Sequence, residues 1–188
     1  MRQATLLKLL ALLGLCILTV TAGCAPGSSA RSRFYMPVAL VAPGDAPPQA
    51  KAGGIRVGIG PLRLAEYLDR PQIVTRGDGV QVQLAEFERW AEPLEDSVAR
   101  VVAKNVSRLM GDRPLEVFPW NSSADPAFQV RGEILRLDGE LGKDAVLEAW
   151  FSIIGSSRKG DSRKVAYREP AGPNYDSLVQ AESRLLER

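Results

Sequence analysis

The sequence predicts an α+β domain, in which a mostly antiparallel sheet carries two main helices packed on one of its faces. Two observations lead to this fold class. Short segments rich in β-branched residues recur between turns that contain Gly, Pro or Asp, as strands do. Two longer segments instead place apolar residues three and four positions apart, as amphipathic helices do. There is no internal repeat, and we expect a single domain over residues 34–188.

Eight segments are expected to be strands. Pro37 limits the first of them to a sheet edge or an interrupted strand, because proline cannot donate to a ladder. Strict alternation over residues 80–84 after Gly77-Asp78-Gly79 predicts a hairpin with a three-residue loop. The alternation changes phase between Ile134 and Leu135, which predicts a β-bulge. The expected strands cover residues 34–41, 55–64, 72–76, 80–86, 115–119, 128–137, 145–154 and 163–168.

Two helices are expected between and after these strands. The first runs from Pro93, which suits the first helical position, to about Met110. Glu95 and Asp96 complement the positive end of its dipole, and Gly111 ends it. The second helix begins after Asn174, whose side chain is a favourable N-cap. The apolar stripe of the first helix consists of Leu94, Val98, Val101, Val102, Val106 and Leu109.

The N-terminus reads as an export signal over residues 1–23. Arg2 and Lys8 make its start basic, and the apolar stretch of residues 9–21 is too short to span a bilayer comfortably. Cys24 directly after Ala-Gly resembles the bacterial lipobox, in which the thiol receives diacylglycerol and the freed amine a further acyl chain such as palmitate. The alternative is an ordinary secretory signal followed by a chance cysteine.

A lipidated Cys24 would become the first residue of the mature chain. More than one acyl chain holds a protein firmly to a membrane. Residues 24–33 are small and polar and form a flexible tether. By resemblance to the enteric sorting rule, Ala25 indicates the periplasmic face of the outer membrane.

Composition excludes several classes of function. Residues 1–23 carry two basic residues and no acid, so 22 of the 24 basic residues remain against 22 acidic ones. A neutral mature chain gives nucleic-acid binding no electrostatic support. The chain has no histidine, the commonest general base and metal ligand, and its two cysteines lie in the signal and at the lipidation site. We therefore expect a non-enzymatic protein without a metal or other cofactor.

Two stretches behind the lipobox, residues 55–76 and 82–110, resemble a known family. The most specific parts are YLDRPQ at residues 67–72 and ERWAEPL at residues 88–94, together with FYMP at residues 34–37. They resemble the PqiC family of ABC-type transport auxiliary lipoproteins, also called membrane integrity-associated transporter subunits. The resemblance covers most of the mature chain.

The resemblance implies an auxiliary or adaptor subunit of an MCE-type phospholipid transport system between the inner and outer membranes, which supports envelope integrity. Its partners would be an MCE-domain periplasmic protein and a membrane-embedded transporter subunit, and a homo-oligomeric ring is one possible form. The alternative is a lipid carrier that holds an acyl chain in its own cavity, which needs an apolar cavity of about 300 Å³ or more. An envelope hydrolase serves only as a contrast, because no catalytic motif supports it.

The candidate partner-binding residues lie in the two most specific segments. The turn before residue 73 combines an aromatic, a charged pair and a proline, and it is either a docking loop or a solvated structural turn. The tryptophan before the first helix is either a packed anchor or a lipid contact. Basic residues around the last hairpin face either anionic headgroups or solvent: Arg158, Lys159, Arg163, Lys164 and Arg168. The partner-binding candidates are Tyr67, Asp69, Arg70, Pro71, Gln72 and Trp90.

Overall fold

The computed structural model describes residues 30–39, 56–77, 79–110, 115–119, 126–155 and 158–188. Two compact units divide the chain, Met1–Arg31 and Ser32–Arg188, and every helix and strand described lies in the second. The predicted signal, Cys24 and most of the predicted tether fall outside the described residues. Within those described ranges, no helix is long and apolar enough to cross a membrane.

The described elements follow the predicted order of strands and helices, with shifted ends. β6, β7 and β8 are longer than expected, and β1 is shorter because the strand stops before Pro37. The strands are β1 Arg33–Tyr35, β2 Val57–Leu64, β3 Gln72–Arg76, β4 Val82–Trp90, β5 Glu116–Val117, β6 Phe128–Gly139, β7 Asp144–Gly155 and β8 Arg158–Pro170. The helices are α2 Leu94–Leu109 and α3 Tyr175–Leu185.

The sheet is mixed, so the expectation of a mostly antiparallel sheet is wrong. Its eight described strands run β1-β4-β3-β6-β2-β5, and β7 and then β8 extend from the other edge of β6. Four pairings are parallel (β1–β4, β2–β5, β2–β6 and β3–β6), and three are antiparallel (β3–β4, β6–β7 and β7–β8). The chain between β2 and β6 contains α2, and parallel neighbours need such a crossover connection.

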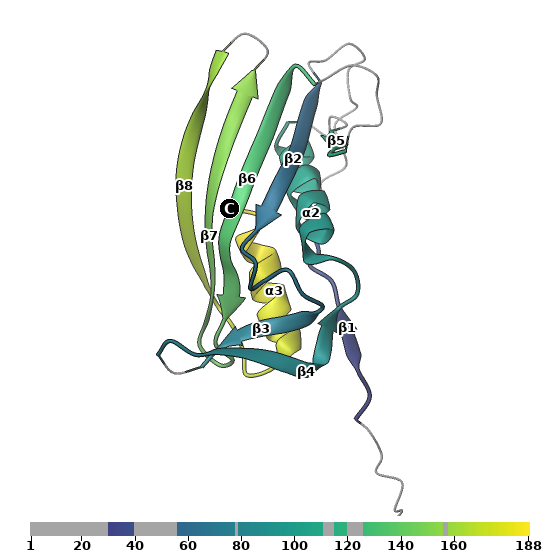
Figure 1. The fold of residues 1–188 in the computed structure, drawn as a ribbon, viewed down its shortest axis with the longest axis vertical. Coiled ribbons are helices and arrows are strands. Elements are labelled where there is room, and N and C mark those ends of the chain that lie inside the picture. The colour runs from purple at the N-terminus through teal and green to yellow at the C-terminus, as the bar shows by residue number, and fades with distance from the viewer. Residues whose placement is uncertain (1–29, 40–55, 78, 111–114, 120–125, 156–157) are drawn as a thin grey trace, which may run out of the picture. The chain divides into compact units, whose positions relative to one another are not determined.

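Long strands form one side of the domain. β2, β6, β7 and β8 lie side by side, and β3 and β4 cross near one end of them (Figure 1). The register of β6 against β7 shifts between Ile134 and Arg136, which confirms the β-bulge predicted from the change of alternation at Leu135.

The hairpin of β3 and β4 has a longer connection than predicted. Arg76 pairs with Val82, and the Gly77 N–H donates to the carbonyl of Gln81 at 3.1 Å. The predicted three-residue loop is therefore wrong, and Asp78 within it lies outside the described residues. Alternation over residues 80–84 determines which side chains share a face, but it does not determine where pairing begins.

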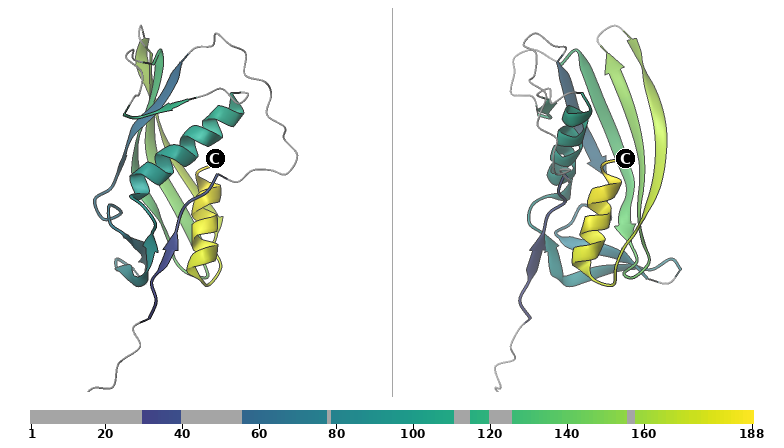
Figure 2. Two further views of the ribbon diagram at one scale, coloured as in Figure 1. Left: turned by 90° about the vertical axis from the view of Figure 1, so that its right-hand side faces the viewer. Right: turned by 180° about the vertical axis from the view of Figure 1, so that it is seen from behind.

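Both helices pack on one face of the sheet, as predicted (Figure 2). Pro93 is the N-cap of α2 rather than its first helical residue. The predicted N-cap of the last helix is confirmed, because the Ser177 N–H donates to Asn174 Oδ1 at 2.9 Å. The Ser177 hydroxyl donates in turn to the Asn174 carbonyl at 2.7 Å.

The core lies between the helices and the sheet. Fully buried aliphatic side chains come from both layers, and each contributes about 1.5–3 kcal/mol relative to exposure. Two acidic side chains, Asp138 on β6 and Glu182 on α3, are also completely buried. The largest buried apolar side chains are Ile59, Leu62, Leu68, Ile73, Ile134, Leu137, Leu178, Leu185 and Val98.

Candidate functional site

The turn between β2 and β3 is locally ordered. The Leu68 N–H donates to the carbonyl of Ala65, and the Arg70 N–H donates to the carbonyl of Leu68, each at 2.8 Å. Leu68 is only 1% exposed and anchors the turn in the core. Asp69 and Pro71 are exposed on the outer side of the same turn.

The turn lies against the junction of β4 and α2. The Trp90 N–H donates to the carbonyl of Pro71 at 2.7 Å, so a backbone hydrogen bond joins two segments that are distant in sequence. A hollow of about 370 Å³ opens between them, and we call it the turn pocket. Asp69, Arg70 and Pro71 form one wall, and residues 90–94 form the other.

The charged groups Glu92 and Arg70 of the turn pocket differ in their hydrogen bonds and ion pairs. Glu92 accepts a hydrogen bond from Ser97 and forms an ion pair with Arg100, both on α2. The Nε of Arg70 is buried and has no hydrogen-bond partner among the residues that the structure describes. A buried donor without a partner costs free energy that a bound acceptor would recover. Arg70 is thus the charged group of this pocket that the described residues hold least completely.

Tyr67 belongs to a different cluster. Its hydroxyl donates to the buried Asp138 Oδ2 at 2.7 Å, and the Arg76 guanidinium lies 5.4 Å from the centre of its ring. Arg76 Nε and Arg136 Nε donate to the two Asp138 oxygens at 3.1 and 2.8 Å. Burial, followed by the hydrogen bond to Asp138, raises the pKa of Tyr67 above its ordinary value. The side chain of Tyr67 therefore links the turn to Asp138 on β6.

The predicted site residues divide into two groups. Asp69, Arg70, Pro71 and Trp90 line one pocket, although Trp90 is 6% exposed and packs in the core as an anchor. The other two do not line it. Tyr67 contacts Asp138, and Gln72 pairs with Arg89 in the ladder of β3 and β4.

Strand β1 is hydrogen-bonded to the end of β4 and to Ala91, in the segment that forms one wall of the turn pocket. Arg33 Nε and Nη2 donate to the two carboxylate oxygens of Glu88 at 2.9 and 2.7 Å, and the Ala91 N–H donates to the carbonyl of Tyr35 at 2.8 Å. The hydrogen bond from Arg33 lowers the pKa of Glu88. Burial raises the pKa of Tyr35 to about 12.

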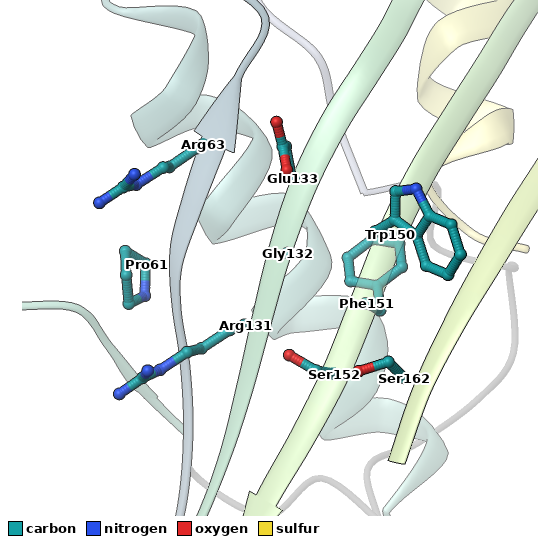
Figure 3. A pocket seen from close by; sticks show the side chains of 9 residues that line it. All are labelled: Pro61, Arg63, Arg131, Gly132, Glu133, Trp150, Phe151, Ser152 and Ser162. Atoms are coloured by element: carbon teal, nitrogen blue, oxygen red, sulfur yellow. The ribbon is translucent and has the colours of Figure 1, made fainter. Parts of the chain in front are cut away.

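Sequence reasoning missed a second hollow, on the open face of the sheet. Its volume is about 420 Å³, and Figure 3 shows its side chains in front of the strands with the helices behind. Arg63 and Arg131 extend to the same side, with Pro61 between them, and Trp150 stands on the opposite side (Figure 3). Alternation along each strand could have placed these side chains on one face, but only the pairing of β2 with β6 brings the two arginines together.

The described residues offer no site for a metal ion. Within those ranges, no three His, Cys, Asp or Glu side chains come together as ligands would. Both hollows present charged side chains, and the hollow on the open face adds the exposed Trp150, which suits binding of a partner or ligand.

Solved structures share this α+β fold. One, described only as an uncharacterized protein, matches with a TM-score of 0.66 at 14% identity, over 84% of this chain and 93% of its own. The protein XCC0632 from Xanthomonas campestris, of the DUF330 family, matches with a TM-score of 0.62 at 19% identity, over 82% of this chain and 88% of its own. The likeness defines the class of fold to which this domain belongs.

The sequence identifies the family within that class. Residues 39–188 match the ABC-type transport auxiliary lipoprotein component family, and the chain belongs to it. This confirms the resemblance carried by residues 67–72 and 88–94. No curated protein matches the chain in sequence. A PelC dodecamer from Paraburkholderia phytofirmans matches with a TM-score of 0.42 at 15% identity, over 76% of this chain and 90% of its own. This likeness is too distant to bear on the present chain.

Proposed function

We propose that this protein is a non-enzymatic adaptor lipoprotein of an MCE-type phospholipid transport system. Lipid on Cys24 holds it at the periplasmic face of the outer membrane, where it docks an MCE-domain protein that a membrane-embedded subunit accompanies. One observation carries the proposal: the two segments with the strongest family resemblance, residues 67–72 and 88–94, meet at the turn pocket.

The turn pocket has the properties of a docking site. Its walls are fixed before a partner arrives, because Leu68 and Trp90 are buried and a backbone hydrogen bond joins Pro71 to Trp90. A pre-ordered surface loses less entropy on binding. The side chain of Arg70 is partly exposed, and its guanidinium offers a charged donor to an acidic group of the partner.

The alternative function, a carrier that encloses an acyl chain, receives less support. The two hollows described, of about 420 and 370 Å³, are open to solvent and lined in part by charged residues. An acyl chain is best held in an enclosed apolar cavity. Native mass spectrometry after detergent extraction tests the alternative, since a carrier would retain phospholipid. The same spectra report whether the protein forms a homo-oligomeric ring.

The docking role is tested with Arg70→Glu. Charge reversal should reduce recovery of the MCE-domain protein in pull-downs about tenfold, as expected for a charge pair in an interface. Thermal melting should stay nearly unchanged. The matched control is Arg163→Glu, whose side chain is 82% exposed on β8, and it should recover the partner normally. If Arg70→Glu lowers stability and reduces binding only in proportion, Arg70 has a structural role and the docking site lies elsewhere.

Anchoring is tested with Cys24→Ser. Serine has no thiol for diacylglyceryl transfer, so the variant should leave the outer-membrane fraction as uncleaved or released protein. Globomycin should cause precursor of the wild-type protein to accumulate. Mature Cys24→Ser protein in the outer membrane would contradict lipidation at this residue.

A further inference from the structure

Two cross-strand rows build the hollow on the open face of the sheet. In one row, Arg63 pairs with Glu133, and Glu133 pairs with Trp150. Trp150 pairs in turn with Lys164 on β8, whose amine forms an ion pair with Glu148 at 3.8 Å. In the next row, Arg131 pairs with Ser152, which pairs with Ser162 on β8. The neighbours Leu62, Ile134 and Ala149 on the same strands are buried in the core, so the rows lie on the face away from the helices.

The two arginines do not use the carboxylate beside them. Neither Arg63 nor Arg131 forms an ion pair or side-chain hydrogen bond within the part of the chain that the structure describes. Glu95 on α2 feels the charge of Arg63 without forming an ion pair with it. Figure 3 shows both guanidinium groups extending away from Glu133, on either side of Pro61. Two guanidinium groups aimed to the same side suit the oxygens of a phosphate, which arginine binds in bidentate geometry.

The remaining groups favour a ligand that also carries a positive charge. Glu133 lies between the guanidinium groups and Trp150 (Figure 3), so it would repel a ligand that is only anionic. Trp150 is 46% exposed, and an indole face attracts an ammonium group. Tryptophan, like tyrosine, is also enriched where water meets lipid.

We propose that this hollow binds the headgroup of a zwitterionic phospholipid of the phosphoethanolamine type. Arg63 and Arg131 hold the phosphodiester, and Glu133 and the Trp150 indole hold the ammonium. Ser152 and Ser162 offer hydroxyl donors at the edge of the site. The proposal goes beyond the docking role and does not depend on it, since the headgroup is bound without any partner protein.

The test titrates glycerophosphoethanolamine into the full-length lipoprotein in an uncharged maltoside detergent, with amide chemical shifts of β6 and β7 as the readout. Inorganic phosphate and glycerophosphoglycerol are the comparison ligands. We expect saturable binding of glycerophosphoethanolamine, and the double variant Arg63→Gln, Arg131→Gln should raise its Kd about tenfold or more. The control Arg163→Gln should not change the Kd. Unchanged thermal melting shows that each variant is folded.

Three results would overturn the proposal. Inorganic phosphate binding as tightly as glycerophosphoethanolamine, with the same dependence on the arginines, would define a bare anion site. Shifts that persist in the double variant would place the ligand elsewhere. Tighter binding of glycerophosphoglycerol would exclude the ammonium contact, whereas loss of the preference for glycerophosphoethanolamine in Glu133→Gln would support it. The pull-down with Arg70→Glu is unaffected by any of these results, so the two proposals fail separately.

Discussion

The turn pocket and the open sheet face are built in opposite ways. The turn pocket depends on buried anchors, Leu68 and Trp90, and on a backbone hydrogen bond between distant segments. The hollow on the open face depends on side chains such as Arg63 and Arg131, which the strands present but which contribute little to the core. The shape of the turn pocket is therefore coupled to folding, whereas the open face can change its side chains without changing the fold.

The largest expected effect is the difference between a new charge in the core, which supports the turn pocket, and a new charge on the open face of the sheet. Val98 on α2 is completely buried, and Val98→Asp should cost about 3 kcal/mol or more, a large part of a stability of about 5–15 kcal/mol. Trp150→Asp on the open face should change the free energy of unfolding far less, because Trp150 is already 46% exposed. Thermal and urea melting of both variants measures the difference. Equal losses would mean that the open face is covered in the folded protein.

A smaller effect is expected at the acidic centre beneath the turn. Asp138 is 0% exposed and accepts hydrogen bonds from Tyr67, Arg76 and Arg136. Asp138→Asn removes the charge, and we expect a loss of about 2 kcal/mol, since hydrogen bonds to charged groups are the stronger ones. The matched control is Asp144→Asn at the exposed start of β7, which should stay within about 0.5 kcal/mol of the wild type. If urea melting gives the same stability for both variants, this cluster does not hold the turn in place.

The smallest effect is a pH dependence from Glu182. Its two carboxylate oxygens are buried and have no hydrogen-bond partner within the described ranges. Burial, and then the charge of Asp138, raises the pKa of Glu182 well above the ordinary 4.5. The folded state thus keeps a proton that the unfolded state loses, so this residue lowers stability as the pH rises above 4.5. Glu182→Gln should remove that loss, with a gain over wild type on the order of 1 kcal/mol at pH 8 and little at pH 4.

The exposed Glu187 supplies the control for this measurement. Glu187→Gln makes the same substitution at an exposed residue of the same C-terminal region and measures the effect of the substitution itself. Urea unfolding of the three proteins between pH 4 and pH 8 isolates the contribution of Glu182 from those of other acids, such as Glu88, whose lowered pKa acts in the opposite direction. A gain for Glu182→Gln that shrinks as the pH rises would contradict the assignment.

Local features of the fold could be predicted from the sequence. The cap at Asn174 depends on contacts within one turn, and the bulge after Ile134 appears as a change of alternation. The direction of strand pairing could not be predicted, because β2 pairs with β6 across a long stretch of chain, and neither strand alone indicates that partner. The error about a mostly antiparallel sheet has this physical origin.

The candidate site, like the fold, could be predicted only in part from the sequence. The family resemblance selected the segments that form the turn pocket, but it did not indicate which way each side chain points. Tyr67 lies next to Leu68 and Asp69 in sequence, yet its hydroxyl contacts Asp138, because a turn sends successive side chains in different directions. Arg63 and Arg131 were missed for the opposite reason, since only the parallel register of β2 and β6 makes them neighbours.

The pairing of β1 would have a mechanical consequence under the anchoring proposed at Cys24. β1 runs parallel to β4 with Tyr35 opposite Trp90, and the Val38 N–H donates to Ser183 Oγ on α3 at 3.1 Å. Tension along the tether would load these hydrogen bonds together in shear instead of opening them one after another. The same strand would carry the force to Trp90 at the turn pocket and to α3. Traction between the membrane and a docked partner would therefore enter the domain through the short N-terminal strand, at its hydrogen bonds to β4 and to α3.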